Sequence, residues 1–394
     1  MKAGEGGPLA GVRVVDLTVN ILGPVATQVL GDMGADIVKV EPPTGDPIRF
    51  MGPSRSPGMS VFFLNTNRNK RSVVLDLKRP EAMDALLHLV DGADVFVHNM
   101  RLGAAERLGL SYAALAKRNR RLVYAAATGF RQSSRWRDKP AFDDVIQGMS
   151  GIADLVARRD GKPGFVPMAI ADKFCGFAFA SAIGMALYRR ERTGVGQEVH
   201  VPMLETMLSF NLVEHLWGAT LDDPSLGVGY VRMLTPFRRP HATADGYICL
   251  LANTDEQWAR LFVAIDRPEL AQDARFARLE QRTLNIAALY EIVTDVMRTR
   301  TTAEWQRRLD AADIPNGPVL SLDSMLDDPY LNETGFFQRV EHPTEGRMIT
   351  TTVATEFSES PGSIRRLAPR LGEHTAEVLR EAGLPEATVA ALTA

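Results

Sequence analysis

The chain has few of the residues that build disulfide scaffolds, metal sites and redox centres. Its 394 residues include two cysteines, Cys175 and Cys249, which stand far apart and form no CxxC pair. The seven histidines show no metal-ligand spacing, and no HExxH motif occurs. This pattern argues against a disulfide framework, a zinc site and a redox dithiol, and it suits a reducing compartment. We therefore expect a cytoplasmic protein without a metal.

The sequence also lacks a long hydrophobic run and an excess of charge. No run approaches the roughly 20 apolar residues of a membrane span, and the first residues lack the unbroken apolar core of a signal peptide. The longest apolar stretch, residues 174–188, is broken by Gly176 and Gly184 and predicts a buried helix. The net charge of -3 gives no reason to expect nucleic acid or an anionic membrane as a partner.

Three common signatures of nucleotide binding and catalysis are absent as well. There is no P-loop, and residues 194–199 (GVGQEV) lack the third glycine of the dinucleotide fingerprint. No Gly-x-Ser-x-Gly elbow occurs. These absences exclude P-loop enzymes and serine hydrolases of that type, but they do not name a function.

The sequence does contain a regular alternation of short apolar runs and helix-like segments. Such alternation predicts a parallel sheet with helices on both faces, in which ligands sit at the carboxyl ends of the strands. The expected strands cover residues 11–17, 35–41, 71–77, 93–99 and 121–130, and the expected helices between them cover 24–34, 80–92 and 111–120.

The rest of the chain shows a different organisation. A mainly helical section over 143–217 is interrupted by a strand pattern at 197–203, and a Gly- and Pro-rich linker follows at 222–246. A strand at 247–253, several amphipathic helices and a strand at 317–322 indicate a second, smaller domain. Residues 336–357 alternate like a hairpin with a Glu-Gly turn, and two helical patterns close the chain.

Several of these segments, taken in order, resemble the family III CoA-transferases, also called the CaiB/BaiF or formyl-CoA transferase family. The resemblance rests on NRNKRSVVLDLKRPE (67–81), ADVFVHNMRLGAAERLGLSY (93–112), ADKFCGFAFASAIGMALYRRERTGVGQEVHVPMLE (171–205) and APRLGEHTAEVLREAGL (368–384). It implies an α/β protein with a large Rossmann-like domain from residues 1–221 and 362–394. A smaller α+β domain would cover 222–335, with a return linker at 336–361. The resemblance also implies a homodimer of interlocked rings.

The resemblance implies an acyl-CoA:carboxylate CoA-transferase with Asp172 as its nucleophile. The aspartate would attack an acyl-CoA carbonyl to give a mixed anhydride, and CoA thiolate would convert this to an aspartyl-CoA thioester. The partners would be an acyl-CoA donor and a carboxylate acceptor, so CoA is a co-substrate and no cofactor is permanently bound. From the residues alone, Asp172 precedes a helical pattern and is interpreted as a helix N-cap, which would also favour its ionised form.

The resemblance further implies a set of CoA-binding residues. Arginine suits the phosphates of CoA because its fork binds oxyanions bidentately, although a lone arginine is more often a solvated surface residue. Ordinary loop packing is the alternative for the residues of the first strand–helix turn. The basic run Arg68–Arg71 is interpreted as a solvated turn or as a source of one phosphate contact. The predicted CoA-binding residues are Asn20, Leu22, Asn99, Met100, Arg101 and Arg107.

Two alternative functions remain open on this reading. One is α-methylacyl-CoA racemisation on the same fold, which uses an Asp–His pair to move protons. The histidine of that pair falls where this chain has Phe142, and phenylalanine cannot carry a proton. The other alternative is a CoA-binding protein without turnover, which only an assay excludes.

Departures from the formyl-CoA transferase pattern bear on the substrate. Val19 stands where a basic residue is usual, Ile21 replaces a glutamine, and Pro42 replaces a CoA-contacting arginine. The glycine-rich loop that closes over the acyl group is missing, with only Gly227 and Gly229 near that place. These changes argue against oxalate and formate, and an apolar Ile21 in the site would suit a larger or less polar acyl group.

Overall fold

A computed structural model describes residues 6–393, and the chain divides into two compact units. The large unit contains the described residues of Met1–Gly151, Phe165–Phe210 and Tyr330–Ala394, and the small unit contains Ile152–Gly164 and Asn211–Pro329. The domain boundaries expected from the sequence stay a prediction.

The large unit is built on a six-stranded parallel sheet with the strand order β3-β2-β1-β4-β5-β6. Parallel pairing joins each neighbouring pair, for example Val14 of β1 with Ile37 of β2 and with Val95 of β4. The α/β fold and the parallel sheet expected from the sequence are therefore confirmed. The strands are β1 (Arg13–Leu17), β2 (Asp36–Glu41), β3 (Lys70–Val74), β4 (Val95–His98), β5 (Val123–Thr128) and β6 (Gln197–Pro202).

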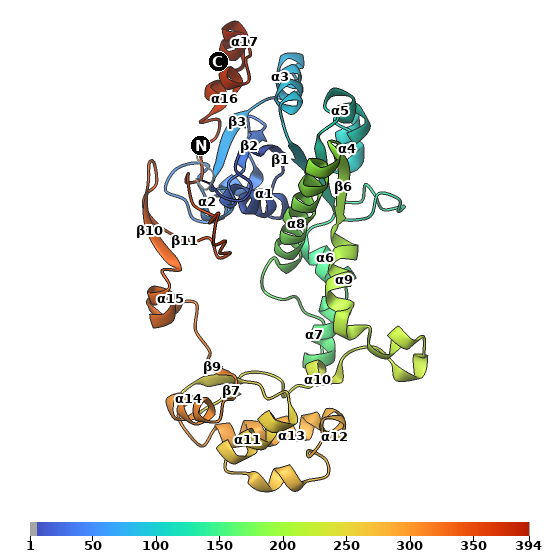
Figure 1. The fold of residues 1–394 in the computed structure, drawn as a ribbon, viewed down its shortest axis with the longest axis vertical. Helices are drawn as coiled ribbons and strands as arrows, with labels where there is room; N and C mark the ends of the chain where they lie inside the picture. The colour runs from blue at the N-terminus through green and yellow to red at the C-terminus, as the bar shows by residue number, and fades with distance from the viewer. Residues whose placement is uncertain (1–5, 394) are drawn as a thin grey trace. The chain divides into compact units, whose positions relative to one another are not determined.

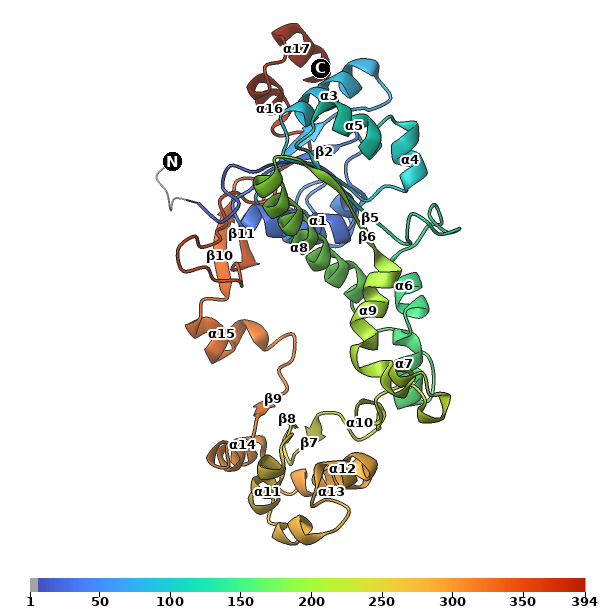
Figure 2. The same ribbon diagram turned by 45° about the vertical axis from the view of Figure 1, so that its right-hand side comes forward.

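Helices cover both faces of this sheet (Figures 1 and 2). One face carries α1 (Leu22–Asp32) and α8 (Ile170–Thr193), which pack against each other. On the other face, alternate strand residues such as Val15, Val38 and Phe96 form one hydrophobic core with the covering helices. Those helices are α3 (Pro80–Asp91), α4 (Leu102–Arg107), α5 (Tyr112–Arg118), α16 (Thr375–Glu381) and α17 (Glu386–Thr393).

The remaining elements of the large unit are short. The hairpin of β10 (Phe337–His342) and β11 (Gly346–Thr351) is confirmed, as are the two closing helices α16 and α17. Sequence patterning missed several pieces that are too brief to show a helical period. These are η1 (Pro47–Phe50), α2 (Val61–Thr66), α4 and α15 (Pro329–Glu333), while α6 (Asp143–Met149) lies at the start of the expected helical section.

Helix α8 crosses the large unit as a core helix and is the described helix that is long and apolar enough, by length and composition, to cross a membrane. One side of α8 packs inside the protein, with Cys175, Phe179 and Ile183 completely buried, while other apolar side chains of the helix are exposed. Its packing on α1 requires a glycine, because a Cβ at Gly176 would lie 2.7 Å from the backbone oxygen of Leu22. The second turn of α8 is thereby held close to the first turn of α1.

The small unit has its own hydrophobic core around the buried side chains of Trp258, Leu289 and Trp305. Its antiparallel sheet has the order β7-β8-β9, with β7 (His241–Ala242), β8 (Tyr247–Leu250) and β9 (Asn316–Pro318). Its main helices are α11 (Asp255–Ala264), α12 (Leu279–Leu284), α13 (Ile286–Met297) and α14 (Thr302–Ala311).

Other parts of the small unit are α7 (Ile152–Asp160), α10 (Val231–Leu234) and the 3₁₀ turns η2 (Trp217–Leu221), η3 (Pro224–Leu226), η4 (Pro268–Gln272) and η5 (Met325–Asp327). Helix α9 (Met203–His215) starts in the large unit, and its residues from Asn211 onward belong to the small one.

Candidate active site

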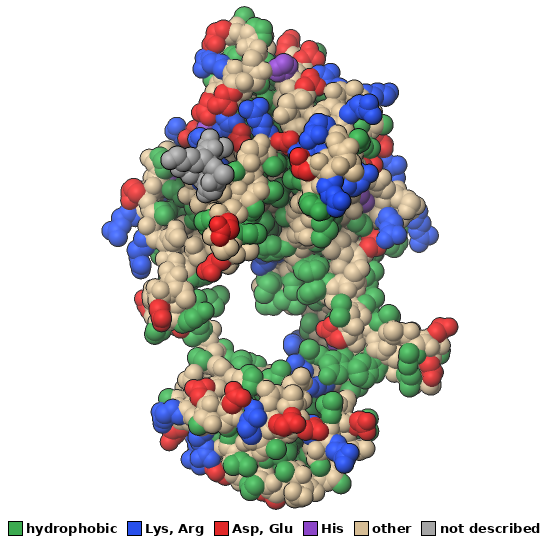
Figure 3. All heavy atoms as spheres, in the orientation of Figure 1, with side chains coloured by type: hydrophobic (Ala, Val, Ile, Leu, Met, Phe, Trp, Pro, Cys, Tyr) green, Lys and Arg blue, Asp and Glu red, His purple; other side chains and the backbone are tan. Residues whose placement is uncertain are grey.

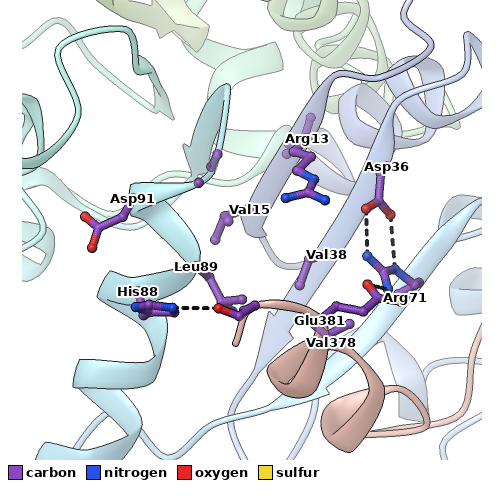
Figure 4. Close-up of a pocket in the computed structure, with 14 residues that line it drawn as sticks. Arg13, Val15, Asp36, Val38, Arg71, His88, Leu89, Asp91, Val378 and Glu381 are labelled. Carbon is purple, nitrogen blue, oxygen red and sulfur yellow. Dashed lines mark hydrogen bonds and ion pairs between the residues drawn. The ribbon is translucent and has the colours of Figure 1, made fainter. Parts of the chain in front are cut away.

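Two cavities at opposite ends of the parallel sheet are candidates for a ligand site. The first, of about 220 Å³, lies at the amino ends of β1 and β2, where Arg13 and Asp36 line it (Figure 4). Its most buried cation, Arg71, is already paired with Asp36 at 2.6 Å and with Glu377 and Glu381 at 3.1 and 2.6 Å. An arginine with three carboxylate partners has little left to offer an anionic ligand.

The second cavity, of about 380 Å³, lies at the carboxyl ends of the strands. Its wall is formed by the residues that follow β1 and β4, by the end of β5, and by Met203 directly after β6. The strand order reverses between β1 and β4, and open α/β sheets bind ligands at such a switch point. We therefore take this cavity as the candidate active site.

Asp172 lies in the wall of the second cavity, in the first turn of α8. It is not the N-cap: that position is held by Ala169, whose methyl side chain accepts no hydrogen bond from the helix. The N-cap interpretation was therefore wrong. Among the described residues, no hydrogen-bond partner of the Asp172 carboxylate is found, so the group is available to a substrate.

The carboxylate of Asp143 accepts a backbone N–H in the first turn of α8, where the N-cap residue provides no side-chain acceptor. Asp143 begins α6 and is buried, and its Oδ1 accepts the Asp172 backbone N–H at 3.0 Å. Its Oδ2 accepts the Gln147 amide at 2.5 Å. Burial, and after it the Asp143 charge, raises the pKa of Asp172 from 3.8 to about 7. This direction is opposite to the one expected from a helix N-terminus, because desolvation and a like charge both favour the neutral acid.

The structure brings most of the sequence-predicted residues into this cavity and leaves one out. Arg107, the last residue of α4, is exposed and does not line the cavity. Met100 both lines the cavity and packs against the core beneath it. The predicted residues that line the cavity are Asn20, Leu22, Asn99, Met100, Arg101 and Asp172.

The side chain of Asn99 is engaged with the protein itself. Its Oδ1 accepts the Val19 N–H at 2.9 Å, and its Nδ2 donates to the Val19 carbonyl oxygen at 2.8 Å. Asn99 thus ties the turn after β1 to the end of β4 across the switch point. The amide recognises a neighbouring backbone, and any contact between Asn99 and CoA stays a prediction.

Two cationic side chains of the cavity wall, Arg137 and Lys139, were not predicted from the sequence. Lys139 lies over the ring of Trp136, with Nζ 4.6 Å from the ring centroid, and Arg137 donates to Glu106 at 2.7 Å. Both belong to the irregular loop after β5. Loops that follow parallel strands carry ligand contacts, so a basic and aromatic loop at this place was the available signal.

The basic run at the start of β3 is buried and paired within the protein. This corrects both interpretations from the sequence, the phosphate contact and the solvated turn. Arg68 pairs with Asp32 at 2.7 Å, and Lys70 lies 3.5 Å from Asp16. Asn69 and Lys70 are buried, and Arg71 belongs to the first cavity described above. None of these four residues lines the cavity of Asp172, so the run is not a solvated turn either.

Proton-transfer chemistry finds little support in the cavity wall. Phe142, which is 67% exposed, lies where the racemase histidine would be, and none of the described residues that line the cavity is a histidine. His200 hydrogen-bonds Thr128 at 2.8 Å, and burial lowers its pKa to about 4. Cys175 is completely buried, and burial raises the pKa of its thiol to about 12, as expected for a structural thiol.

Known proteins resemble this chain over nearly its whole length. The model of CoA-transferase family III matches residues 9–375. The succinate–glutarate CoA-transferase of Agrobacterium fabrum is 33% identical over 389 residues, which is 95% of each chain. The succinyl-CoA:mesaconate CoA-transferase of Haloarcula hispanica is 33% identical over 97% of this chain and 98% of its own. A crystal structure of a CaiB/BaiF family protein from Brucella suis superposes with a TM-score of 0.78, at 29% identity over 96% of this chain and all of that one.

Proposed function

Since this chain belongs to CoA-transferase family III and is a CoA-transferase, we propose that it moves CoA between carboxylic acids through an intermediate on Asp172. The observation that carries the proposal is the position of Asp172. Its carboxylate has no partner among the described residues, and it lies in a cavity at the switch point of the sheet. A carboxylate in this place can react with a thioester without a base, because it carries no proton once ionised.

The first half of the reaction would proceed in two steps. An oxygen of Asp172 attacks the thioester carbonyl of the acyl-CoA donor, the C–S bond breaks, and CoA leaves as its thiolate. The product is a mixed anhydride between Asp172 and the acyl group. The thiolate then attacks the aspartyl carbonyl, so that the donor acid leaves as a carboxylate and an aspartyl-CoA thioester remains.

The second half would repeat these steps in reverse with a new acid. The acceptor carboxylate attacks the aspartyl-CoA carbonyl and expels CoA thiolate, which gives a second anhydride. Thiolate attack on the acyl carbonyl of that anhydride forms the new acyl-CoA and returns Asp172. Each anhydride must be kept from water, because hydrolysis would lose the activation.

The cations of the cavity wall would hold the anionic parts of CoA. Arg101, Arg137 and Lys139 all line the cavity, and Arg101 is exposed at the start of α4. Arginine binds phosphate oxygens in a bidentate way, whereas lysine acts as a point charge. We assign phosphate binding to Arg101 first, because the side chain of Arg137 already donates to Glu106.

The substrates are proposed from the names of the relatives. The relatives from Agrobacterium fabrum and Haloarcula hispanica are named for transfer between dicarboxylic acids, with succinate or succinyl-CoA as one partner. We therefore propose succinyl-CoA as the first donor to test, with dicarboxylic acids as acceptors. Ile21 does not line the cavity, which corrects the expectation that it faces the acyl group, whereas the apolar Phe142 does line it. A panel that also contains monocarboxylic acids tests whether Phe142 favours a less polar acyl group.

The test is an acyl-exchange assay with a proton-exchange control. The purified chain is incubated with succinyl-CoA and each acceptor acid, and the new acyl-CoA is measured by mass spectrometry. We expect the acceptor thioester and free succinate in equal amounts. The same protein is given a 2-methylacyl-CoA in deuterated water. Deuterium at the α-carbon without acyl transfer would favour the racemase, and CoA binding without either product would leave a binding protein.

We also propose that the active form is a homodimer. Three large apolar side chains on one face of α8, namely Phe177, Met185 and Tyr188, are 58%, 69% and 65% exposed. Figure 3 shows hydrophobic side chains exposed in the part of the large unit where α8 lies. An apolar stripe of this kind is typical of a surface that a second chain covers. Light scattering should give twice the mass of one chain, and a monomer at assay concentration would contradict the proposal.

A further inference from the structure

The turn that follows β1 is held in place by side chains from distant parts of the chain. The N–H of Thr18 donates to Asp16 Oδ1 at 2.8 Å, and its carbonyl oxygen accepts Lys39 Nζ at 2.8 Å. The next residue, Val19, is paired in both directions with the amide of Asn99, as described above. Side chains from β1, from β2 and from the end of β4 thus bind successive backbone groups of one turn.

Asp46 completes this set of contacts at Asn20. Its Oδ1 accepts the backbone N–H of Asn20 at 3.0 Å and that of Ile48 at 3.2 Å. Its Oδ2 accepts Lys39 Nζ at 2.8 Å, and both side chains of this ion pair are completely buried. The Lys39–Asp46 pair therefore holds the turn at both of its ends, at Thr18 through the lysine and at Asn20 through the aspartate.

Stability alone does not explain a buried ion pair. Removing two charges from water is costly, and apolar residues of the same shape are often as stable or more so. Burial by itself would lower the pKa of Lys39, but Asp46, Asp16 and Glu41 outweigh it and raise that pKa. Lys39 is thus kept charged at this place, and the pair provides directional contacts to a turn that an apolar pair could not make.

The turn is connected to the candidate active site in two ways. Val19 and Asn20 line the cavity that contains Asp172, and Asn20 has a left-handed backbone with φ of 65°. Such a conformation is strained for a residue with a side chain and persists only where its surroundings fix it. A Cβ at Gly23 would lie 2.2 Å from Thr18 Cβ, so α1 begins directly against the turn, and Gly176 packs α8 on the same end of α1.

We propose that the Lys39–Asp46 ion pair is a positioning device, which fixes Asn20 and the turn after β1 relative to Asp172 and so sets the geometry of acyl transfer. This inference rests on the proposed function. The pair itself touches no substrate, because both side chains lie beneath the cavity wall. Its effect should therefore be on the rate of the bound complex rather than on the binding of CoA.

The test replaces both charges with apolar residues of similar shape, as Lys39→Met with Asp46→Leu. The matched control is Arg68→Met with Asp32→Leu, which removes another buried ion pair of the same unit, 2.7 Å long, that does not contact the turn. For each protein the melting temperature, kcat and the KM for the CoA thioester are measured. Trapping of the acyl group on Asp172 is measured in parallel.

We expect the Lys39/Asp46 variant to lose about 100-fold in kcat, with KM changed by less than about 3-fold, because a shift near 1 Å costs this much in rate. The Arg68/Asp32 control should keep its kcat within about 3-fold at a comparable or larger loss of melting temperature. Equal loss of kcat in both variants, or full kcat in the Lys39/Asp46 variant, would overturn the inference. A wild-type protein with no transfer and no label on Asp172 would instead overturn the proposed function.

A single-residue pair of variants covers the case in which the double variant does not fold. Asp46→Asn keeps an oxygen that can accept the Asn20 N–H, whereas Asp46→Ala has none. We expect kcat to be roughly ten times higher in Asp46→Asn than in Asp46→Ala, at similar KM. Equal kcat in these two variants would show that the contact with Asn20 does not position the turn.

Discussion

Two groups of charged residues in the large unit differ in burial and in pairing. The buried charge network, which we define as Asp16, Lys39, Asp46 and Lys70, is completely inaccessible, and each member has a partner of opposite charge within 3.5 Å. In the cavity, Asp172 is only partly buried, its carboxylate has no partner among the described residues, and Arg101 is exposed. The comparison teaches that pairing, and not residue type or distance from a strand end, separates charges that hold the fold from charges available to a substrate.

The largest effect is expected at the unpaired carboxylate. Asp172→Ala should lower acyl transfer by at least about 10³-fold, because the proposed reaction has no other nucleophile. The control is Asp144→Ala, an exposed aspartate in the first turn of α6, which should keep its activity. The measurement is acceptor-CoA formation under saturating donor. Transfer in Asp172→Ala at a rate near that of the control would remove the distinction between the two groups.

Removal of a paired buried charge should lower the unfolding free energy and leave acyl transfer unchanged. Arg68→Met leaves Asp32 buried without its partner, and breaking a buried pair costs about 3–5 kcal/mol of unfolding free energy. Denaturant unfolding measures this loss, while kcat of the folded fraction should stay unchanged. If Arg68→Met keeps its stability and loses acyl transfer, a paired charge would be needed for the reaction, and the basic run would contact the substrate.

Substitution of the two arginines predicted to bind CoA, Arg101 and Arg107, should affect KM to different extents. Arg101→Ala should raise the KM for the CoA thioester about 10-fold at constant kcat, which is the loss of one charge-assisted contact. Arg107→Ala should change KM by less than about 2-fold, because Arg107 does not line the cavity. Neither variant should alter the unfolding free energy by more than about 0.5 kcal/mol. Equal effects on KM would place Arg107 in the site after all.

The pH dependence tests the environment of Asp172. Its pKa is raised from 3.8 to about 7, so kcat/KM should rise with pH up to about 7 as the nucleophile ionises in the free enzyme. The folded protein then binds this proton more tightly than the unfolded chain. The stabilising contribution is present below pH 3.8 and is lost as the pH rises through 7.

The sign of this linkage is checked with Asp172→Asn, which has no charge to bury. It should be more stable than wild type at pH 8 by at most about 4 kcal/mol, with a much smaller difference at pH 4. Thermal unfolding at the two pH values measures both differences. A variant that is less stable at pH 8 would show that the ionised carboxylate is favoured in the cavity.

Much of the fold was predictable because the parallel strands are buried on both faces and read as apolar runs. The expected strands at 11–17, 35–41 and 93–99 correspond to β1, β2 and β4. The strand expected at 71–77 ends at Val74, and α2 and α4 were missed, because six residues are too few to establish a helical period.

The site was less predictable because its geometry depends on contacts between distant residues. Asp172 was predicted to be the nucleophile from the family resemblance. Its local sequence indicated a helix N-cap, which the structure does not show. The basic run at 68–71 looked exposed, since its partners Asp16, Asp32 and Asp36 lie more than thirty positions away. Arg137 and Lys139 stand in an irregular loop, where no periodicity marks a role.

In the proposed reaction, Asp172 carries first the acyl group and then CoA. The direct measurement is to incubate the protein with succinyl-CoA, trap the intermediate with hydroxylamine or borohydride, and locate the label by peptide mass spectrometry. We expect one modified residue, Asp172, in the peptide that begins α8, and no label in Asp172→Ala. A label on any other residue, or transfer with Asp172 unmodified, would contradict it.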